Sequence, residues 1–133
     1  RAVIPGMTVR RSGMIINIGS IAGKEVYPNG SVYCGSKHAV DAITKGMRLD
    51  LNAFGIRVVA IHPGLVETEF SLVRFKGDED KADAVYQGIE PLVAQDIADI
   101  VEFAVTRPAH VTIADVVVLP TSQASATLVN RKK

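Results

Sequence analysis

Short runs of apolar residues recur along the chain and predict buried strands. Three runs stand out because they are rich in Ile and Val and stop at a glycine, a proline or a polar stretch: residues 14–18, 57–61 and 115–119. Nearly continuous β-branched runs of this length are typical of strands that are covered on both faces of a parallel sheet. We therefore expect three central strands in one sheet.

Between these runs the apolar residues change to spacings of three and four, which predicts helices. One stripe follows Val32 and stops at Gly55, and a second begins near Asp96, a carboxylate that suits the positive end of a helix dipole. Residues 2–7 are interpreted as the last turns of a helix. Residues 67–95 are polar and irregular, with one short helix expected near 81–86. The alternation of strand and helix predicts an α/β fold, a doubly wound parallel sheet of the Rossmann type.

Composition narrows the class of protein. The 133 residues are 47% hydrophobic and 22% charged, which suits one globular domain or part of one. The net charge of +1 gives no reason to expect nucleic acid as a partner, and residues 131–133 are interpreted as a solvated basic tail. No apolar run approaches the length of a membrane span, so we expect no membrane partner.

The single cysteine, Cys34, excludes an intrachain disulfide and fits a reducing, cytoplasmic location. The chain has three scattered histidines, to which we assign no metal: His38, His62 and His110.

Tyr33 and Lys37 form the first candidate for chemistry. Four residues on a helix return to the same face, and Ser31 is the predicted N-cap, so both side chains lie in the first turns. A nearby ammonium and the positive end of the helix favour the phenolate. Such a base takes a proton from an alcohol as hydride leaves the same carbon, and returns it in the reverse direction. The pair alone is a weak signal, and its position after a strand and a turn-rich loop strengthens it.

Ser20 lies thirteen residues before Tyr33, at the end of the first predicted strand. The carboxyl ends of parallel strands form the edge at which α/β sheets bind ligands. A hydroxyl there is suited to hold a substrate oxygen and to share the charge that develops on it. The alternative is a loop serine that satisfies local backbone groups.

Three stretches in this order resemble the second half of the short-chain dehydrogenase/reductase family: residues 17–23 (NIGSIAG), 33–37 (YCGSK) and 62–68 (HPGLVET). Within that family, residues 63–77 and 120–125 look like NADP-dependent 3-hydroxy acid dehydrogenases. The resemblance makes Tyr33 the general acid/base, Lys37 the group that favours its phenolate and binds the nicotinamide ribose, and Ser20 the substrate-orienting hydroxyl. It also implies a nicotinamide wall built from Pro63, Gly64, Val66 and Thr68.

The charged segment from Glu69 to Leu92 is expected to be a mobile flap over the substrate. Arg74 is the candidate there for binding a substrate carboxylate, because a guanidinium pairs with a carboxylate in two parallel hydrogen bonds. The alternative for Arg74 is an ordinary solvated arginine.

The family's glycine-rich turn for the pyrophosphate is not among these residues, and neither is the residue near the second strand that separates NAD from NADP. We therefore expect residues 1–133 to be the C-terminal half of one Rossmann-type domain, with its last three strands. NADP is the expected cofactor, with NAD left open, and we expect no stable cofactor-binding monomer from these residues alone. The resemblance implies a homo-oligomer, a tetramer. Two alternatives stay open: a reductase of another carbonyl or alcohol substrate, and a fragment without catalysis.

Overall fold

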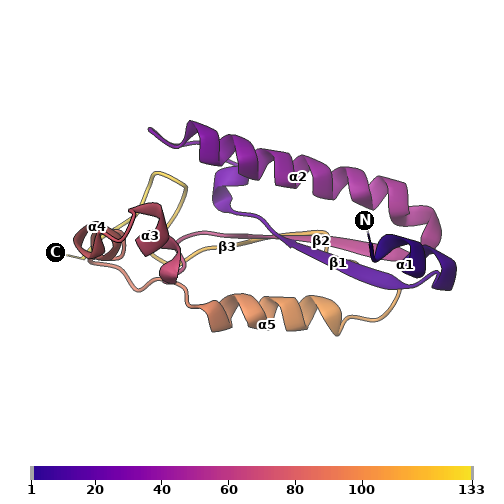
Figure 1. The fold of residues 1–133 in the computed structure, drawn as a ribbon. Coiled ribbons are helices and arrows are strands. Elements are labelled where there is room, and N and C mark those ends of the chain that lie inside the picture. Colours follow the sequence, from indigo (N-terminus) through magenta and orange to yellow (C-terminus); the bar gives the residue numbers. More distant parts are fainter. Residues whose placement is uncertain (1, 133) are drawn as a thin grey trace.

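The computed structural model describes residues 2–132 and contains a three-stranded parallel sheet (Figure 1). The strands are β1 (Gly13–Ile18), β2 (Ile56–Pro63) and β3 (Asp115–Val118), in the order β1-β2-β3. Along its whole length β1 pairs with β2, from Gly13 beside Ile56, whereas β3 pairs only with the second half of β2. The three predicted strands and their parallel arrangement are confirmed.

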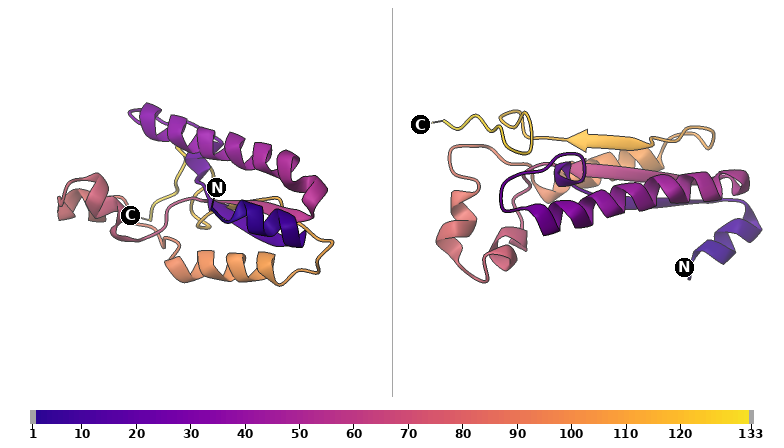
Figure 2. Two further views of the ribbon diagram at one scale, coloured as in Figure 1. Left: turned by 45° about the vertical axis from the view of Figure 1, so that its right-hand side comes forward. Right: turned by 90° about the horizontal axis from the view of Figure 1, so that it is seen from above.

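Helices cover both faces of the sheet, with α2 (Ser31–Leu51) on one side and α5 (Ala94–Val105) on the other (Figure 1). The shorter helices are α1 (Ile4–Arg10), α3 (Glu69–Arg74) and α4 (Glu79–Ala84), and two 3-10 turns are η1 (Ile21–Gly23) and η2 (Asn52–Phe54). Helices α3 and α4 lie with the C-terminal segment at one end of the sheet, and α1 lies at the opposite end (Figure 2). Among residues 2–132, no helix combines the length and the apolar character needed to cross a membrane.

The core is built around β2. Alternate residues of this strand point to opposite faces, so Val58 packs with Leu51 of α2 while Val59 packs with Ala104 of α5. Both valines are fully buried. The uninterrupted apolar run of this segment therefore reflects a central strand with a helix on each side.

Three local details differ from the sequence-based expectations. The N-cap of α2 is Gly30 instead of Ser31, and a Cβ added at Gly30 would lie 2.3 Å from the Tyr27 ring, so the close packing of this ring requires glycine. Helix α3 forms inside the segment expected to be irregular, and Thr68 caps it by accepting the Phe70 N–H at 3.3 Å. Its six residues are too few to show an apolar period. The N-terminal helix runs three residues beyond Met7.

Candidate active site

A cavity of about 430 Å³ opens where the carboxyl ends of β1 and β2 meet helix α3 and the start of α2. The sequence-predicted residues Ser20, Tyr33, Pro63, Gly64, Val66, Thr68 and Arg74 all line this cavity. The fold therefore brings together residues that are up to 54 positions apart in the chain (Ser20 to Arg74). Lys37 is the predicted residue that does not line it.

Ser20 is buried and follows the end of β1 after one intervening residue, Gly19. Its backbone is extended, and its hydroxyl oxygen accepts the Ala22 N–H at 3.1 Å, which caps the 3-10 turn η1. The hydroxyl thus satisfies a local backbone group, as the alternative interpretation expects. Because the same residue also lines the cavity, the hydroxyl retains a second acceptor site and its own proton for a bound molecule.

Tyr33 lies in the first turn of α2 and half-buries its ring against the flap helix α3. The ring centroids of Tyr33 and Phe70 are 5.7 Å apart, in a tilted arrangement. The Lys37 Nζ lies 5.8 Å from the Tyr33 ring centroid and donates a long hydrogen bond, 3.4 Å, to the Ile18 carbonyl. The ammonium therefore sits behind the tyrosine, at the end of β1, instead of in the cavity.

The segment after β2 forms the apolar wall of the cavity. The Gly64 N–H donates to the Val118 carbonyl at 2.7 Å, which continues the strand pairing past Pro63. A Cβ added at Gly64 would collide with the Oε1 of Gln123, so a larger residue here would displace the buried Gln123 side chain. The same Oε1 accepts the Leu65 N–H at 2.9 Å. Gln123 is buried, and it fixes the wall from the C-terminal segment.

Tyr86 ties the flap to this wall. Its hydroxyl donates to the Val66 carbonyl at 2.8 Å and shares a hydrogen bond of 2.7 Å with the Ser71 hydroxyl of α3. Since Ser71 is buried, this pair closes one side of the cavity. The flap is therefore connected to the wall by Tyr86 and by the backbone hydrogen bonds of Leu92 with Leu65 and Glu67.

Arg74, the last residue of α3, is exposed and lies over two aromatic rings. Its Cζ is 5.7 Å from the Tyr27 ring centroid and 5.6 Å from the Phe75 centroid. Burial raises the pKa of Tyr27, and the Arg74 charge opposes that rise. This arrangement leaves a guanidinium at the mouth of the cavity, stacked on aromatic faces.

The sequence analysis did not predict several other residues that line this cavity, among them Tyr27, Phe70, Tyr86 and Gln123. Tyr27 precedes a proline in the turn-rich loop, a position that restricts its backbone but does not single out its side chain. Gln123 lies within residues 120–125, which carry part of the family resemblance, but no local pattern predicted that it reaches a loop 58 positions earlier.

A second group of polar residues lies behind Ser20. Asp41, His62 and Asp115 each place one potential metal-ligand atom within 4.8 Å of the others. However, the Lys24 ammonium already lies 2.8 Å from the Asp41 carboxylate and 2.6 Å from that of Asp115. Because an ammonium supplies the positive charge between these carboxylates, we interpret the group as an ion-pair network.

Comparison with known proteins decides the family. Residues 1–79 match the family model of the short chain dehydrogenases. The chain belongs to this family. A relative from Schizosaccharomyces pombe, an NADP-dependent 3-hydroxy acid dehydrogenase, is 49% identical over 133 residues, which are 100% of this chain and 51% of the relative. A serine dehydrogenase solved in its closed form with NADP+ superimposes with a TM-score of 0.92 at 44% identity, over 100% of this chain and 54% of the other.

Another relative of similar identity carries a different name. The sulfoacetaldehyde reductase 2 of Chromohalobacter salexigens is 43% identical over 132 residues, or 98% of this chain and 52% of the relative. The chain thus spans about half the length of the curated relatives it matches. The names of these two relatives give different substrates, so membership of the family does not by itself define the substrate.

Proposed function

We propose that this chain carries the acid/base and substrate-binding part of an oxidoreductase that exchanges hydride between NADP and the hydroxyl-bearing carbon of a small 3-hydroxy acid. The observation that carries the proposal is the single cavity that Ser20, Tyr33 and the segment from Pro63 to Thr68 share. The names of the relatives support the cofactor and the substrate class. NAD remains the alternative cofactor.

The cavity fits the reactive ring of a nicotinamide. One wall, from Pro63 to Val66, is apolar and backbone-rich, which suits the face of a planar ring. The opposite side presents the hydroxyls of Ser20 and Tyr33, which suit an alcohol or carbonyl oxygen. In this proposal Val66 and Thr68 lie near the carboxamide of the ring.

When bound, NADP+ supplies the acceptor for the hydride that leaves the alcohol carbon. In this mechanism Ser20 donates a hydrogen bond to the substrate oxygen, and Tyr33 takes the hydroxyl proton as the C–H bond breaks. The alcohol thereby loses a hydride and a proton and becomes a carbonyl. Lys37, whose Nζ lies 5.8 Å from the Tyr33 ring centroid, would bind the nicotinamide ribose.

Arg74 is the proposed anchor for the acid group of the substrate. Its guanidinium lines the cavity and is held over the Tyr27 ring, so its orientation is partly fixed before a ligand arrives. A carboxylate or a sulfonate would pair with it, and an uncharged alcohol would not. The alternative remains an arginine that only covers the aromatic rings.

The proposal is tested with the full-length gene product and a panel of substrates, by following NADPH absorbance. We expect turnover of serine, allo-threonine and other 3-hydroxy acids, and weak turnover of simple alcohols. Arg74→Ala should lower kcat/KM for the acids by roughly 10- to 100-fold, the value of a charged hydrogen-bonded pair, and should leave simple alcohols unchanged. Equal losses on both classes would reject Arg74 as the anchor, and preference for sulfoacetaldehyde would favour the reductase alternative. No turnover of any compound would favour the fragment without catalysis.

We further propose that residues 1–133 are the C-terminal half of one Rossmann-type domain and that copies associate as a tetramer through α2. Three large apolar side chains of α2 are exposed, Val32, Ile43 and Leu49, and an added Cβ at Gly35 or Gly46 would meet no atom within 4 Å. Such a face permits close helix packing. Leu49→Arg should shift the assembly to smaller species in analytical ultracentrifugation.

The buried Cys34 is compatible with the proposed cytoplasmic location.

A further inference from the structure

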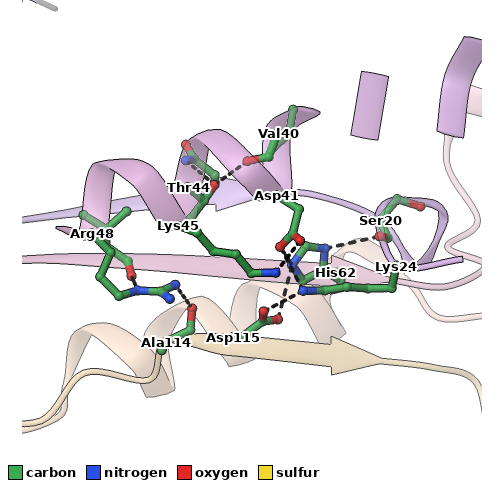
Figure 3. Close-up of polar contacts among 12 residues, drawn as sticks. Ser20, Lys24, Val40, Asp41, Thr44, Lys45, Arg48, His62, Ala114 and Asp115 are labelled. Carbon is green, nitrogen blue, oxygen red and sulfur yellow. Dashed lines mark hydrogen bonds and ion pairs between the residues drawn. The ribbon is translucent and has the colours of Figure 1, made fainter. Parts of the chain in front are cut away.

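His62 is a buried polar residue to which the proposed reaction gives no role. It lies on β2 directly before Pro63, and its side chain is fully buried. Its ring packs against the backbone just before Ser20, because a Cβ added at Gly19 would lie 2.5 Å from the Nδ1 atom. A buried imidazole thus separates the end of β1 from the ion-pair network (Figure 3).

One edge of the ring contacts the Ser20 backbone. The Nδ1 of His62 lies 3.2 Å from the Ser20 carbonyl oxygen. Because a carbonyl only accepts, the Nδ1 must carry the proton of this hydrogen bond. The same oxygen accepts the Gly23 N–H at 2.8 Å, so both of its acceptor sites are used. The Ser20 carbonyl therefore closes the turn η1 through the Gly23 N–H. It is also bonded to β2 through the His62 imidazole.

The opposite edge of the ring faces the ion-pair network. The Nε2 lies 3.2 Å from an Asp115 oxygen and 3.5 Å from an Asp41 oxygen, but it has no partner with hydrogen-bond geometry among residues 2–132. Lys24 bonds both carboxylates, and Lys45 bonds Asp41 at 2.7 Å. These four charged groups, from the residue that follows η1, from α2 and from β3, surround the Nε2 edge (Figure 3).

The burial of the His62 ring and the charges around it agree with a proton on Nδ1. Burial, and then the positive charge of Lys24, lower the pKa of His62, so the ring is neutral at pH 7 and carries one proton. The hydrogen-bond geometry puts that proton on Nδ1. Lys24 and Lys45 neutralise the carboxylates that would otherwise attract a proton to Nε2.

We propose that His62 is a positioning residue, which holds Ser20 at a fixed distance from the wall that begins at Pro63 by donating its Nδ1–H to the Ser20 carbonyl. The inference rests on the proposed function, because it assumes that Ser20 binds the substrate oxygen. Since His62 and Pro63 are neighbours on β2, the hydrogen bond links the two sides of the cavity through one residue. Displacements of about 1 Å in such a site reduce turnover about 100-fold.

The test compares His62→Asn with His62→Leu in the full-length gene product. The two replacements have the same shape, but Asn keeps an N–H donor near the position of Nδ1. We expect kcat to fall by roughly 10- to 100-fold in the Leu variant and by about threefold in the Asn variant, with the Kd for NADPH unchanged in both. Equal losses of kcat in both variants would identify a purely structural ring, and a Leu variant with wild-type kcat would also overturn the proposal.

Nitrogen-15 NMR of the histidine ring gives a reading that is independent of turnover. At pH 7 we expect the His62 signals of a neutral ring that is protonated at Nδ1, and a ring protonated at Nε2 would overturn the inference. If the wild-type protein turned over no substrate, the proposed function would fail, and this spectrum would still decide whether His62 donates to Ser20. Active protein with the wrong tautomer would overturn only the role of His62.

Discussion

The cavity is shared by two regions that are built in opposite ways. The first is the rim formed by the ends of β1 and β2, where Ser20, His62 and Pro63 are buried and bonded to each other or to neighbouring strands. The second is the flap of α3 and α4, whose apolar side chains are largely open to solvent, with Val73 exposed to 74%. The flap is also where positive backbone φ angles occur in succession, at Lys76 and Gly77.

This difference indicates that the two regions have separate roles in the reaction. A proton-transfer site must hold its atoms in place, and the rim does so with a central strand and a buried hydrogen-bond network. A substrate must enter and leave, and a segment with few buried contacts can open at low cost in free energy. We therefore expect changes in the rim to alter kcat or stability, and changes in the flap to alter substrate selection.

The largest expected effect comes from the rim. Tyr33→Phe removes the proposed acid/base group and should lower kcat by about 10²- to 10⁴-fold, measured by NADPH absorbance in the full-length gene product. Tyr27→Phe is the matched control, because it removes one hydroxyl from the same cavity and should cost far less. Similar losses in both variants would mean that Tyr33 is not the proton acceptor.

Replacing one valine in β2, the strand that carries the rim, and one valine in the flap compares how much each region contributes to stability. Val59→Ala removes two methyl groups from the core between β2 and α5, and should lower the free energy of unfolding by about 2 to 3 kcal/mol. Val73→Ala in the flap helix should change it by less than about 0.5 kcal/mol, because that side chain is exposed. Urea denaturation measures both. Equal losses in the free energy of unfolding would contradict the distinction between the strand that carries the rim and the flap.

The ion-pair network behind the rim should make stability depend on pH. Burial opposes the shift, but hydrogen bonds from Lys24 and Lys45 outweigh it and lower the pKa of Asp41 to about 2. Since the native pKa is lower than the unfolded one, ionised Asp41 stabilises the fold fully above the ordinary value of 3.8, and this contribution is lost as the pH falls toward 2.

Asp41→Asn should therefore cost about 2 kcal/mol at pH 7 and clearly less at pH 3, measured by urea denaturation at both values. The control on the flap is Asp78→Asn, which breaks a solvent-exposed pair with Lys81 and should have a small effect at either pH. A loss from Asp41→Asn that is independent of pH would mean that its charge is not what stabilises the fold.

The smallest expected effect tests the connection between the regions. Tyr86→Phe removes the hydroxyl that joins the Val66 carbonyl to Ser71 of α3. The two hydrogen bonds, at about 0.5 kcal/mol each, are together worth about 1 kcal/mol, so we expect KM to rise by roughly fivefold while kcat stays within about twofold. A fall in kcat with unchanged KM would place Tyr86 with the rim instead.

The sequence predicted the central elements because they carry strong local patterns. The run before Pro63 is apolar at almost every position, and its burial on both faces explains why. The stripe from Val32 stops at Gly55, which adopts a positive φ angle of 68°. Helix α3 was missed because Thr68 caps only six residues, and such a short helix is stabilised by its neighbours more than by its own propensity.

The types and spacing of Tyr33, Lys37, Ser20 and the Pro63–Thr68 segment were enough to indicate the family and the kind of chemistry, because the fold of this family places these groups in this order along the chain. The tertiary structure alone decided which other side chains contact these residues and their neighbours. Gln123 reaches the loop at Leu65, Tyr86 reaches Val66, and His62 reaches Ser20 across 42 positions. These contacts join elements distant in sequence, and no local pattern encodes a hydrogen bond whose partner is placed by the packing of a sheet.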